Sequence, residues 1–425
     1  MQHANPFFHR GPVQAPAYFV GRQHEVHTLC ELLRSGQSIA ISGSRRFGKT
    51  SLLFNISSPT ISAQNQLLPS ATCWAYLDGG MLYGLDEEWF LGAIARNLGE
   101  ERDSLKYGEF VERLRDLARN NIRLIVMLDE FELIAANPNF GVTLFNRLRG
   151  LASQFALQFI TVSKLPLAKL AFAQPEALGS PFFNIFAPFL LGPLKEHEAI
   201  ELLVKLATLG GCNFSDDALR FLFGLTGPHP LFLQVAGYHA FGLHQNGQLS
   251  PEIRKMVRER VQIDLNGHLD YYWRNLDDDE QFLLAALPLI EPGNHTSTLD
   301  KLHQAGLLKD GDYLGEVIQQ HVRRQNVLGL LQVGSFLMDT QRKIVAVRGE
   351  RVHLTRNEYL ALKFFLENPG RLVTLEDLET ALWPNDIMTD TERSRGIVKR
   401  LRTALGAYGS LILNHRAQGY VLRPD

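Results

Sequence analysis

The sequence has few of the features that mark secreted, disulfide-bonded or membrane-spanning proteins. Its 425 residues include only three cysteines, Cys30, Cys73 and Cys212, whose spacing suits neither a disulfide framework nor a metal site. No uncharged apolar run approaches the roughly 20 residues that a membrane-spanning helix needs, and the N-terminal residues lack the basic start and apolar run of a secretion signal. No internal repeat of the solenoid kind is visible. We therefore expect a cytoplasmic protein with no membrane segment.

The chain as a whole also lacks an excess of positive charge, but its C-terminal part does not. The formal net charge is −2, whereas residues 336–425 hold 14 Lys and Arg against 11 Asp and Glu. Residues 391–405 alone contain five basic residues and one acidic residue, Glu392. Such a density is typical of a helix that contacts nucleic-acid phosphates. The length is too great for one hydrophobic core and indicates about three domains.

A phosphate-binding motif lies near the N-terminus. Residues 43–50 read Gly-Ser-Arg-Arg-Phe-Gly-Lys-Thr, which matches the pattern G-x-x-x-x-G-K-[ST] at every position. The apolar stretch 38–42 before the motif predicts a buried strand, and residues 51–56 open a helix. A glycine turn at such a junction points backbone N–H groups and a helix N-terminus at an anion. This context argues against an ordinary glycine turn and predicts a nucleoside triphosphate site.

The motif assigns roles to two of its side chains. We expect Lys49 to reach the β- and γ-phosphates and so to assist catalysis, and Thr50 to hold Mg²⁺ through its hydroxyl. The remaining residues expected around the phosphates are Gly43, Ser44, Arg45, Arg46, Phe47, Gly48 and Ser51.

A second acidic element, which a nucleotide site needs for its metal and its water, follows an apolar run. Residues 123–128 are typical of a strand buried on both faces, and they end in Asp129-Glu130. We expect Asp129 to serve Mg²⁺ and Glu130 to act as the general base for an attacking water. Taken without the phosphate-binding motif, the same pair is equally well explained as a charged strand end in a turn.

A third apolar segment, residues 155–164, predicts another core strand that ends in polar side chains. Ser163 or Lys164 at its end is a candidate sensor of the γ-phosphate, although polar residues are common at strand ends. Together the segments predict an α/β P-loop NTPase fold, with a parallel sheet and flanking helices.

These segments resemble the bacterial AAA-like ATPases of the STAND class, which are similar to origin-recognition ATPases. The resemblance lies in Tyr18–Arg22, Leu128–Glu132 and Ser180–Phe186. It implies an ATP/ADP site.

The resemblance also implies which residues contact the adenosine. Phe19, Val20 and Arg22 would line the adenine end, and Pro230 of Gly227-Pro228-His229-Pro230 would touch the base or ribose, with His229 nearby. A plain helix boundary is the alternative for this element, because proline breaks helices and glycine caps them.

AAA+ enzymes with fast turnover take an arginine finger from a neighbouring subunit. Arg147 and Arg149 are the candidates here, but a solvated helix face explains them better. We therefore expect slow ATP hydrolysis, with the nucleotide acting as a switch.

We divide the chain into an N-terminal segment, a P-loop ATPase domain, a helical lid, an internal winged helix and a C-terminal winged helix, over residues 1–17, 18–193, 194–270, 271–335 and 336–425. The lid is predicted from Ala199, Leu202, Leu203 and Leu206, which share one helix face. The predicted recognition helix of the internal winged helix has only Lys301 and His303 as basic residues. We expect that domain to pack against the ATPase instead of gripping DNA.

The C-terminal domain resembles the OmpR/PhoB-type winged helix over essentially all of residues 336–425. The matching elements are Leu354-Thr355 with Glu358, Asn368–Arg371, Leu382–Pro384, Arg400–Arg402 and Gly419-Tyr420. The resemblance implies a DNA-binding module.

The basic helix of this domain has two predicted faces. Ile397, Val398, Leu401 and Leu405 should face the core, which leaves the basic side chains for the major groove of double-stranded DNA. The expected DNA contacts are Arg393, Arg395, Lys399, Arg400 and Arg402 from the helix and Arg416 from the wing. Gly396 is unusual inside a recognition helix. The alternative is a winged helix that binds protein, with its arginines as a solvated face.

The combination leads to a hypothesis of a nucleotide-switched regulator of DNA binding and transcription. ADP would hold the ATPase-side units closed, and ATP with an unknown trigger would open them and promote self-association. Two other hypotheses remain open: a DNA-remodelling or loading ATPase akin to origin-recognition proteins, and a defence-type STAND switch that recruits a protein effector.

Overall fold

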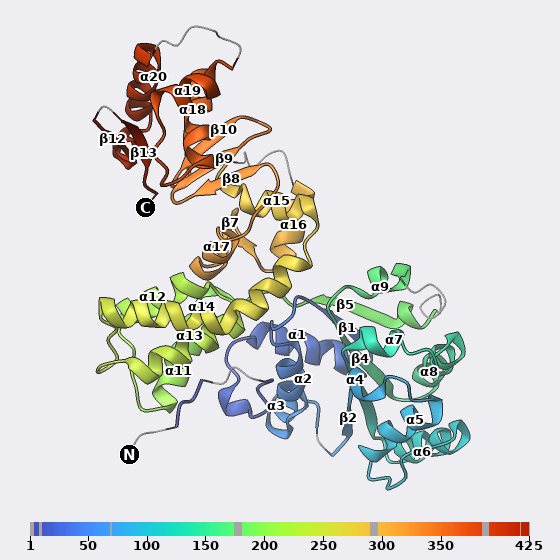
Figure 1. Cartoon of the computed structure of the whole chain (residues 1–425). Coiled ribbons are helices and arrows are strands. Elements are labelled where there is room, and N and C mark those ends of the chain that lie inside the picture. The colour runs from blue at the N-terminus through green and yellow to red at the C-terminus, as the bar shows by residue number, and fades with distance from the viewer. Residues whose placement is uncertain are drawn as a thin grey trace. The chain divides into compact units, whose positions relative to one another are not determined.

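The computed structural model describes residues 4–7, 11–68, 70–173, 181–289, 296–384, 391–416 and 418–424 (Figure 1). Ser180, the first residue of one segment that resembles the STAND class, lies outside them. The chain divides into two compact units. The first comprises Met1–Leu265 together with Gln304–Leu307 and Leu314–Val317, and the second comprises Asn266–His303, Leu308–Tyr313 and Ile318–Asp425. Among the described helices, none is both long and apolar enough to cross a membrane.

A five-stranded parallel sheet forms the centre of the first unit. Its strand order is β2-β3-β4-β1-β5, where the strands are β1 (Ser38–Ser42), β2 (Thr72–Asp78), β3 (Arg123–Asp129), β4 (Leu157–Ser163) and β5 (Phe186–Leu190). Every residue of β1 and β4 is buried, as expected for a sheet covered on both faces. The strands predicted before the phosphate-binding motif and before Asp129 are therefore confirmed.

Helices cover the two faces of this sheet because successive side chains of a strand point to opposite sides. Ile125 and Met127 of β3 belong to a core with Leu29 of α1 and Leu52 of α2, whereas the alternate strand residues face a second core with rings from α5, α6 and α8. The helices of this layer are α1 (Gln23–Arg34), α2 (Lys49–Ser57), α3 (Pro59–Gln64), α4 (Gly79–Leu82), α5 (Glu87–Arg96), α6 (Tyr107–Arg119), α7 (Phe131–Ala135), α8 (Val142–Gln154) and α9 (Leu167–Ala173).

A helical region follows the sheet. It contains α11 (Glu196–Leu209), α12 (Asp216–Thr226), α13 (Pro230–Leu243) and α14 (Pro251–Arg274). Ala199, Leu202, Leu203 and Leu206 of α11 are all buried, as their spacing predicted. The hydroxyl of Ser215 accepts a hydrogen bond from the N–H of Ala218 at 3.2 Å and so caps α12.

The second unit begins with short elements in the order predicted for an internal winged helix. They are α15 (Asp278–Ala285), α16 (Thr296–Gln304), the hairpin of β6 (Leu308–Lys309) and β7 (Asp312–Tyr313), and α17 (Glu316–Val322). The carboxylate of Asp277 accepts from the N–H of Glu280 at 2.8 Å and caps α15. The assignment of this region as a winged helix stays a prediction.

The C-terminal part of the second unit is a winged helix. An antiparallel sheet of order β11-β10-β9-β8 precedes three helices and a hairpin: β8 (Leu330–Val333), β9 (Phe336–Asp339), β10 (Ile344–Val347), β11 (Glu350–Val352), α18 (Arg356–Glu367), α19 (Leu375–Leu382), α20 (Thr391–Ala404), β12 (Ile412–His415) and β13 (Gly419–Leu422). Because β8 pairs with β9, this sheet starts at Leu330, ahead of the boundary predicted at residue 336. The remaining helical turns are 3₁₀ helices at Pro16–Tyr18, Pro181–Ile185, Leu287–Leu289 and Gly406–Leu411.

Candidate functional site

The phosphate-binding loop connects β1 to α2. Its first glycine, Gly43, passes so close to the next segment that a Cβ there would lie 2.3 Å from the carbonyl oxygen of Leu191. Gly48 has φ 84° and caps α2, which begins at Lys49. Glycine is therefore required for space at one end of the loop and for backbone conformation at the other. The N–H groups in the first turn of α2 have no carbonyl partners within the helix, and no side chain of the N-cap residue bonds to them, as suits an anion site.

The ammonium group of Lys49 lies inside this loop. Its Nζ donates to the carbonyl oxygens of Gly43 at 2.7 Å and Ser44 at 2.8 Å. Burial lowers the pKa of Lys49 to about 8, against an opposing effect of Glu132 and Asp129. The amine is therefore partly desolvated and its charge depends on nearby carboxylates.

The carboxylate of Asp129, at the end of β3, joins three elements. Its Oδ2 accepts from the hydroxyls of Thr50 at 2.7 Å and Tyr76 at 3.1 Å, and its Oδ1 accepts from the N–H of Glu130 at 2.9 Å. Asp129 is 4% exposed. A hydroxyl and a carboxylate beside a phosphate cradle are hard oxygen donors of the kind that Mg²⁺ prefers, so Thr50 and Asp129 fit the predicted metal roles.

Tyr76 is a member of this cluster that the sequence analysis missed. It lies on β2, where its neighbour in the register is Met127 of β3. Burial and the carboxylate of Asp129 raise the pKa of Tyr76, so its hydroxyl stays a donor. Tyr76 could have been predicted only if β2 and its parallel pairing with β3 had been recognised from the sequence.

Two more carboxylates lie beyond Asp129. Glu130 has φ 47°, and loss of hydration together with Asp78 and Asp129 raises its pKa. A raised pKa brings a carboxylate closer to the value that a general base needs. Glu132 is the carboxylate with the largest effect on Lys49, and its Oε1 lies 3.9 Å from Nζ of Lys164.

The two candidate sensors at the end of β4 differ in their surroundings. Ser163 is 3% exposed and its hydroxyl donates to the carbonyl oxygen of Leu165 at 2.6 Å. Lys164 is half-exposed and lies near Glu132. Of the two, Lys164 is therefore the more exposed side chain, and Ser163 is held within the strand end.

A cavity extends from the loop towards the lid helices. Ten residues predicted to contact nucleotide line it: Phe19, Val20, Arg22, Arg46, Phe47, Gly48, Lys49, Thr50, Ser51 and Pro230. Gly43, Ser44, Arg45 and Ser163 are not among the lining residues. Residues that the sequence analysis did not assign to the site also line it, namely Gly11, Pro12, Val13, Tyr18, Leu194, Leu202, Leu231 and Gln234.

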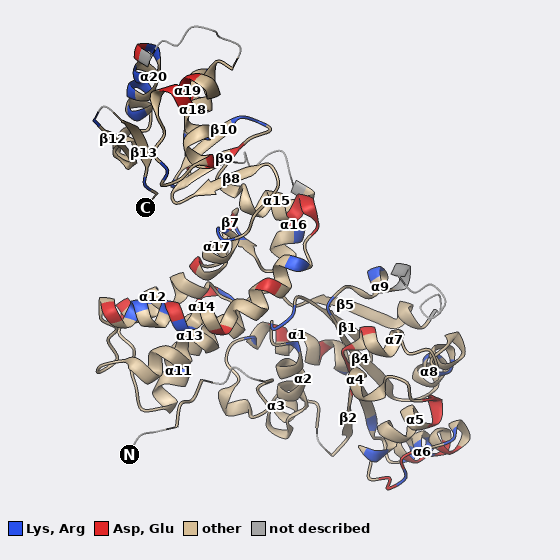
Figure 2. Ribbon diagram, viewed as in Figure 1, with Lys and Arg blue, Asp and Glu red and all other residues tan. Residues whose placement is uncertain are grey.

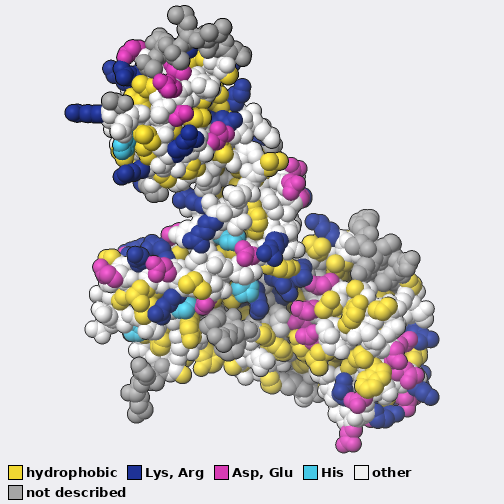
Figure 3. Space-filling view, viewed as in Figure 1, with side chains coloured by type: hydrophobic (Ala, Val, Ile, Leu, Met, Phe, Trp, Pro, Cys, Tyr) yellow, Lys and Arg dark blue, Asp and Glu magenta, His cyan; other side chains and the backbone are white. Residues whose placement is uncertain are grey.

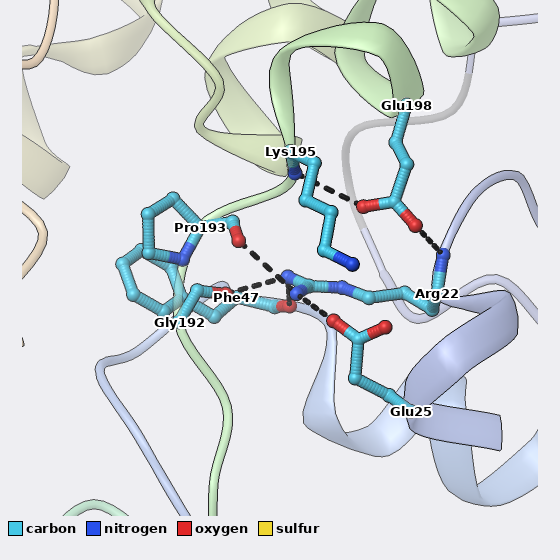
Figure 4. Close-up of polar contacts among 7 residues, drawn as sticks. All are labelled: Arg22, Glu25, Phe47, Gly192, Pro193, Lys195 and Glu198. Carbon is cyan, nitrogen blue, oxygen red and sulfur yellow. Dashed lines mark hydrogen bonds and ion pairs between the residues drawn. The ribbon is translucent and has the colours of Figure 1, made fainter. Parts of the chain in front are cut away.

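Arg22 lines the cavity, but its guanidinium bonds to protein groups (Figure 4). Nη1 donates to Glu25 at 2.9 Å and to the carbonyl of Pro193 at 3.1 Å, and Nη2 donates to the carbonyls of Gly192 at 2.6 Å and Phe47 at 3.4 Å. The side chain thus ties the phosphate-binding loop to the segment between β5 and α11, a structural role that the motif did not predict.

The buried carboxylate of Glu198 completes this arrangement (Figure 4). It is 2% exposed and accepts from the N–H groups of Arg22 at 2.6 Å and Lys195 at 3.0 Å. A Cβ on Gly21 would lie 3.0 Å from the Cβ of Glu198. The first turn of α11 is therefore fastened to the start of α1.

Phe47 connects the loop with two further segments. Its ring lies edge-on to the ring of His229 at 5.0 Å, and His229 stacks on Phe232 at 3.8 Å. On another side, a Cβ on Gly306 would lie 2.1 Å from Cζ of Phe47, and the hydroxyl of Ser44 donates to the carbonyl of Gln304 at 3.1 Å. Gln304–Leu307 thus packs directly on the phosphate-binding loop within the first unit.

The basic helix α20 has the two faces that its spacing predicted. Ile397, Val398, Leu401 and Leu405 are buried. The basic residues lie along α20 and at the turn between β12 and β13 (Figure 2), and Lys and Arg side chains project from the surface of this part (Figure 3). The exposed residues of the predicted DNA-binding set are Arg395, Lys399, Arg400, Arg402 and Arg416.

Arg393 differs from the rest of that set. Its Nη2 and Nε donate to Oε2 of Glu379 at 2.8 and 3.0 Å, and its guanidinium lies 3.8 Å from the centre of the Trp383 ring. The side chain of Glu379 is 4% exposed. The structure therefore places Arg393 between α19 and α20, where it joins these helices.

Comparisons with known proteins agree with both halves of this description. The model of the family described as Novel STAND NTPase 2 matches residues 110–288, and the model described as Transcriptional regulatory protein, C terminal, matches residues 349–422. Residues 110–288 are thus similar to STAND NTPases, and residues 349–422 are similar to the C-terminal domain of transcriptional regulators. The match to the STAND family begins after the phosphate-binding loop, in α6.

Curated relatives match the OmpR/PhoB-type domain. The sensory transduction protein RegX3 of Mycolicibacterium smegmatis is 35% identical over 77 residues, which cover 18% of this chain and 34% of RegX3. The response regulator ArlR of Staphylococcus saprophyticus is 29% identical over 108 residues, 25% of this chain and 49% of ArlR. The chain thus spans about a third to a half of the length of these relatives.

Solved structures share the fold of the STAND-class part. The Walker-type ATPase PABY2304 of Pyrococcus abyssi superimposes with a TM-score of 0.54 at 16% identity, covering 75% of this chain and 99% of that one. The ORC2 protein of Aeropyrum pernix, solved as ADPNP and ADP complexes, gives 0.51 at 16% identity over 76% and 98%. Both likenesses support the P-loop fold.

The arginine-finger candidates of the STAND-class domain lie on α8. Arg147 donates to both oxygens of Glu87 at 2.8 and 2.9 Å, and its guanidinium lies 4.9 Å from the centre of the Tyr107 ring. Arg149 is exposed. The contacts of Arg147 fit the solvated helix face that the sequence analysis favoured.

Proposed function

We propose that this protein is an ATP/ADP-dependent switch that regulates DNA binding, and thereby transcription, through its OmpR/PhoB-type domain. The proposal includes the domain boundaries predicted from the sequence, with the last one moved to the start of β8. It also includes slow ATP hydrolysis, nucleotide-dependent self-association and a trigger of unidentified chemistry.

The observation that carries the proposal is the contact between the phosphate-binding loop and Gln304–Leu307. The hydroxyl of Ser44 is bonded to the carbonyl of Gln304, and Gly306 lies against the ring of Phe47. The same stretch continues in sequence into β6 of the second unit. A phosphate that rearranges the loop would therefore displace a segment that continues in sequence towards the C-terminal domain.

The residues of the loop have distinct tasks in this proposal. Lys49 exchanges its carbonyl partners for phosphate oxygens, and the N–H groups of α2 hold the same anion. Thr50 and Asp129 are the residues that would hold Mg²⁺, which when bound would supply positive charge beside the phosphates. Glu130 takes the proton of the attacking water, and Tyr76 keeps the carboxylate of Asp129 oriented.

The DNA-binding part of the proposal uses the exposed basic residues. Arg395, Lys399 and Arg402 contact the major groove and its phosphates, together with Arg400, and Arg416 contacts the minor groove from the wing. Arg393 is left out of the contact set because Glu379 and Trp383 hold it between two helices.

A direct test compares DNA binding with ATP and with ADP. A duplex selected by the wild-type protein from a random-sequence pool is titrated with wild type and with Lys49→Ala in matched nucleotide samples. We expect a difference between ATP and ADP for wild type that Lys49→Ala abolishes. Equal binding in all four samples would show that the nucleotide does not control DNA binding.

A second candidate function makes hydrolysis itself the output, as in a DNA-remodelling or loading ATPase. Its support is the position of Glu130, which follows β3 and Asp129 directly, where a general base for an attacking water is expected. DNA-stimulated turnover that Glu130→Gln abolishes would support this alternative. DNA-independent, slow turnover would support the switch. An effector-recruiting STAND switch would retain its function when Arg395, Lys399 and Arg402 are neutralised.

A further inference from the structure

The segment before the ATPase core has an anchor in the lid helices. Phe7 is 3% exposed, and its ring centre lies 6.3 Å from those of Phe214 and Phe241. Gly237 of α13 makes room for it, because a Cβ there would lie 2.2 Å from Cε1 of Phe7. The ring therefore occupies a fitted site on the lid.

Asn5 orients this anchor. Its Nδ2 donates to the carbonyl of Tyr238 at 2.9 Å, and its Oδ1 accepts from the N–H of Phe7 at 3.1 Å. Both bonds fix the backbone on which Phe7 stands, and Tyr238 belongs to the same helix as Gly237.

A few residues later, the same segment reaches the nucleotide cavity. The N–H of Val13 donates to the hydroxyl oxygen of Ser51 at 2.9 Å. Ser51 lies in the first turn of α2, directly after Lys49 and Thr50. Gly11, Pro12 and Val13 all line the cavity beside the phosphate-binding loop.

We propose that residues 4–7 and 11–13, here called the N-terminal strap, form a wall of the nucleotide site and hold it by their anchor in the lid. The inference rests on the nucleotide binding proposed above and adds a positioning role for Phe7 and Asn5. The strap has one attachment on the lid and one on α2. A bound nucleotide that orders residues 11–13 would therefore also restrain the lid helices on which Phe7 is anchored.

The chemistry of the wall indicates which part of the ligand it contacts. Pro12 and Val13 offer apolar surface to the cavity, as Phe19 and Val20 do. Apolar lining suits the base and ribose, whereas phosphates need the loop. The strap should thus contribute to the affinity for the nucleoside that ATP and ADP share, and not to the affinity for phosphate alone.

The test uses the full chain and three ligands, Mg-ATP, ADP and tripolyphosphate, in titration calorimetry. Phe7→Ala removes the anchor, and Gly237→Ala displaces it. We expect both variants to bind ATP and ADP about tenfold more weakly, the effect of roughly 1.4 kcal/mol, with tripolyphosphate binding unchanged. If it did not displace Phe7, Gly237→Ala should slightly stabilise α13, because alanine is favoured over glycine inside a helix. A weaker nucleotide affinity in this variant therefore reports the displaced ring.

Two controls separate the strap from general destabilisation. Phe90→Ala removes another buried ring, on α5, from the core between the sheet and helices α5, α6 and α8. It should leave nucleotide affinity unchanged. The double variant Phe7→Leu with Gly237→Ala makes room for the added methyl group and should recover part of the affinity. If Phe7→Ala does not fold, Asn5→Ala and Gly237→Ala are measured in its place.

The outcomes distinguish this inference from the proposed function. Wild-type affinity for ATP and ADP in the strap variants overturns the strap, as does an equal loss with tripolyphosphate or with Phe90→Ala. If wild type itself gives no heat with ATP or ADP beyond that of Lys49→Ala, the proposed nucleotide binding fails, and the inference fails with it.

Discussion

Gly306 lies against the ring of Phe47 so closely that a Cβ would be 2.1 Å from Cζ of the ring. Phe47 is the fifth residue of the phosphate-binding motif and is 1% exposed. Only a residue without a side chain fits there, and the φ of 72° also favours glycine. At this contact the loop and Gln304–Leu307 are held together by close packing and not by an ion pair.

Gly306→Ala should therefore separate Gln304–Leu307 from the loop and remove the difference between ATP and ADP in DNA binding. Gly311→Ala is the matched control, because Gly311 also has a positive φ, 84°, but has no heavy atom within 4 Å of an added Cβ. Both changes carry the same backbone strain, about 1 to 2 kcal/mol. A nucleotide response that survives Gly306→Ala, or that Gly311→Ala also abolishes, would show that the contact does not couple the two parts.

The affinity for ATP should depend on pH through Lys49. Burial lowers the pKa of Lys49 to about 8, so the amine is charged below that pH and becomes neutral above it. Affinity measured by calorimetry should fall as the pH rises from 7 to 9, by up to about tenfold per unit above the pKa. Lys49→Arg, which stays charged, should show no such fall.

Glu132 should shift this pH dependence. Its negative charge is the largest influence that raises the pKa of Lys49 against the effect of burial. Glu132→Gln removes that charge and should move the fall in ATP affinity to lower pH. An unchanged profile would mean that Glu132 does not act on Lys49.

Arg393 should contribute to the stability of the C-terminal domain. Arg393→Ala leaves the buried carboxylate of Glu379 without its guanidinium partner and should cost about 2 kcal/mol in the free energy of unfolding. Arg395→Ala removes an exposed pair with Glu392 and should cost less than about 0.5 kcal/mol. Urea unfolding followed by tryptophan fluorescence measures both. Equal effects would contradict the placement of Arg393 between the helices.

Lys399 should contribute to DNA affinity through phosphate contact. Lys399→Ala should weaken binding and reduce the slope of log K against log salt by about 0.9 for a lost contact. Arg393→Ala, once corrected for any unfolded fraction, should leave the slope unchanged. Titrations of a selected duplex at several salt concentrations provide the comparison, and a slope that Lys399→Ala does not alter would exclude this contact.

The elements that could be predicted are those whose own residues show the apolar pattern of a buried strand or helix face. The β-branched run before Gly43 and the apolar run before Asp129 are buried strands, because period and composition report burial directly. The buried face of α20 followed from a spacing of four residues in the same way.

Contacts between distant segments were not predictable in this manner. Arg22 belongs to the resemblance that implied an adenine contact, yet its guanidinium bonds to carbonyls of Phe47, Gly192 and Pro193. Tyr76 reaches Asp129 only because β2 pairs with β3. The boundary at residue 336 missed β8 because a short half-buried strand has little pattern until its partner is known.

The close approach of Leu191 to Gly43 has a practical consequence for grafting this module. Leu191 follows β5 directly, and its carbonyl fills the space that a side chain on Gly43 would need. A chimera that exchanges the lid directly after β5 would also replace Leu191 beside Gly43, and Gly192 and Pro193, whose carbonyls bond to Arg22. Exchange junctions placed beyond Glu198 would keep the groups that bond to Arg22, whereas junctions at residue 191 would replace them.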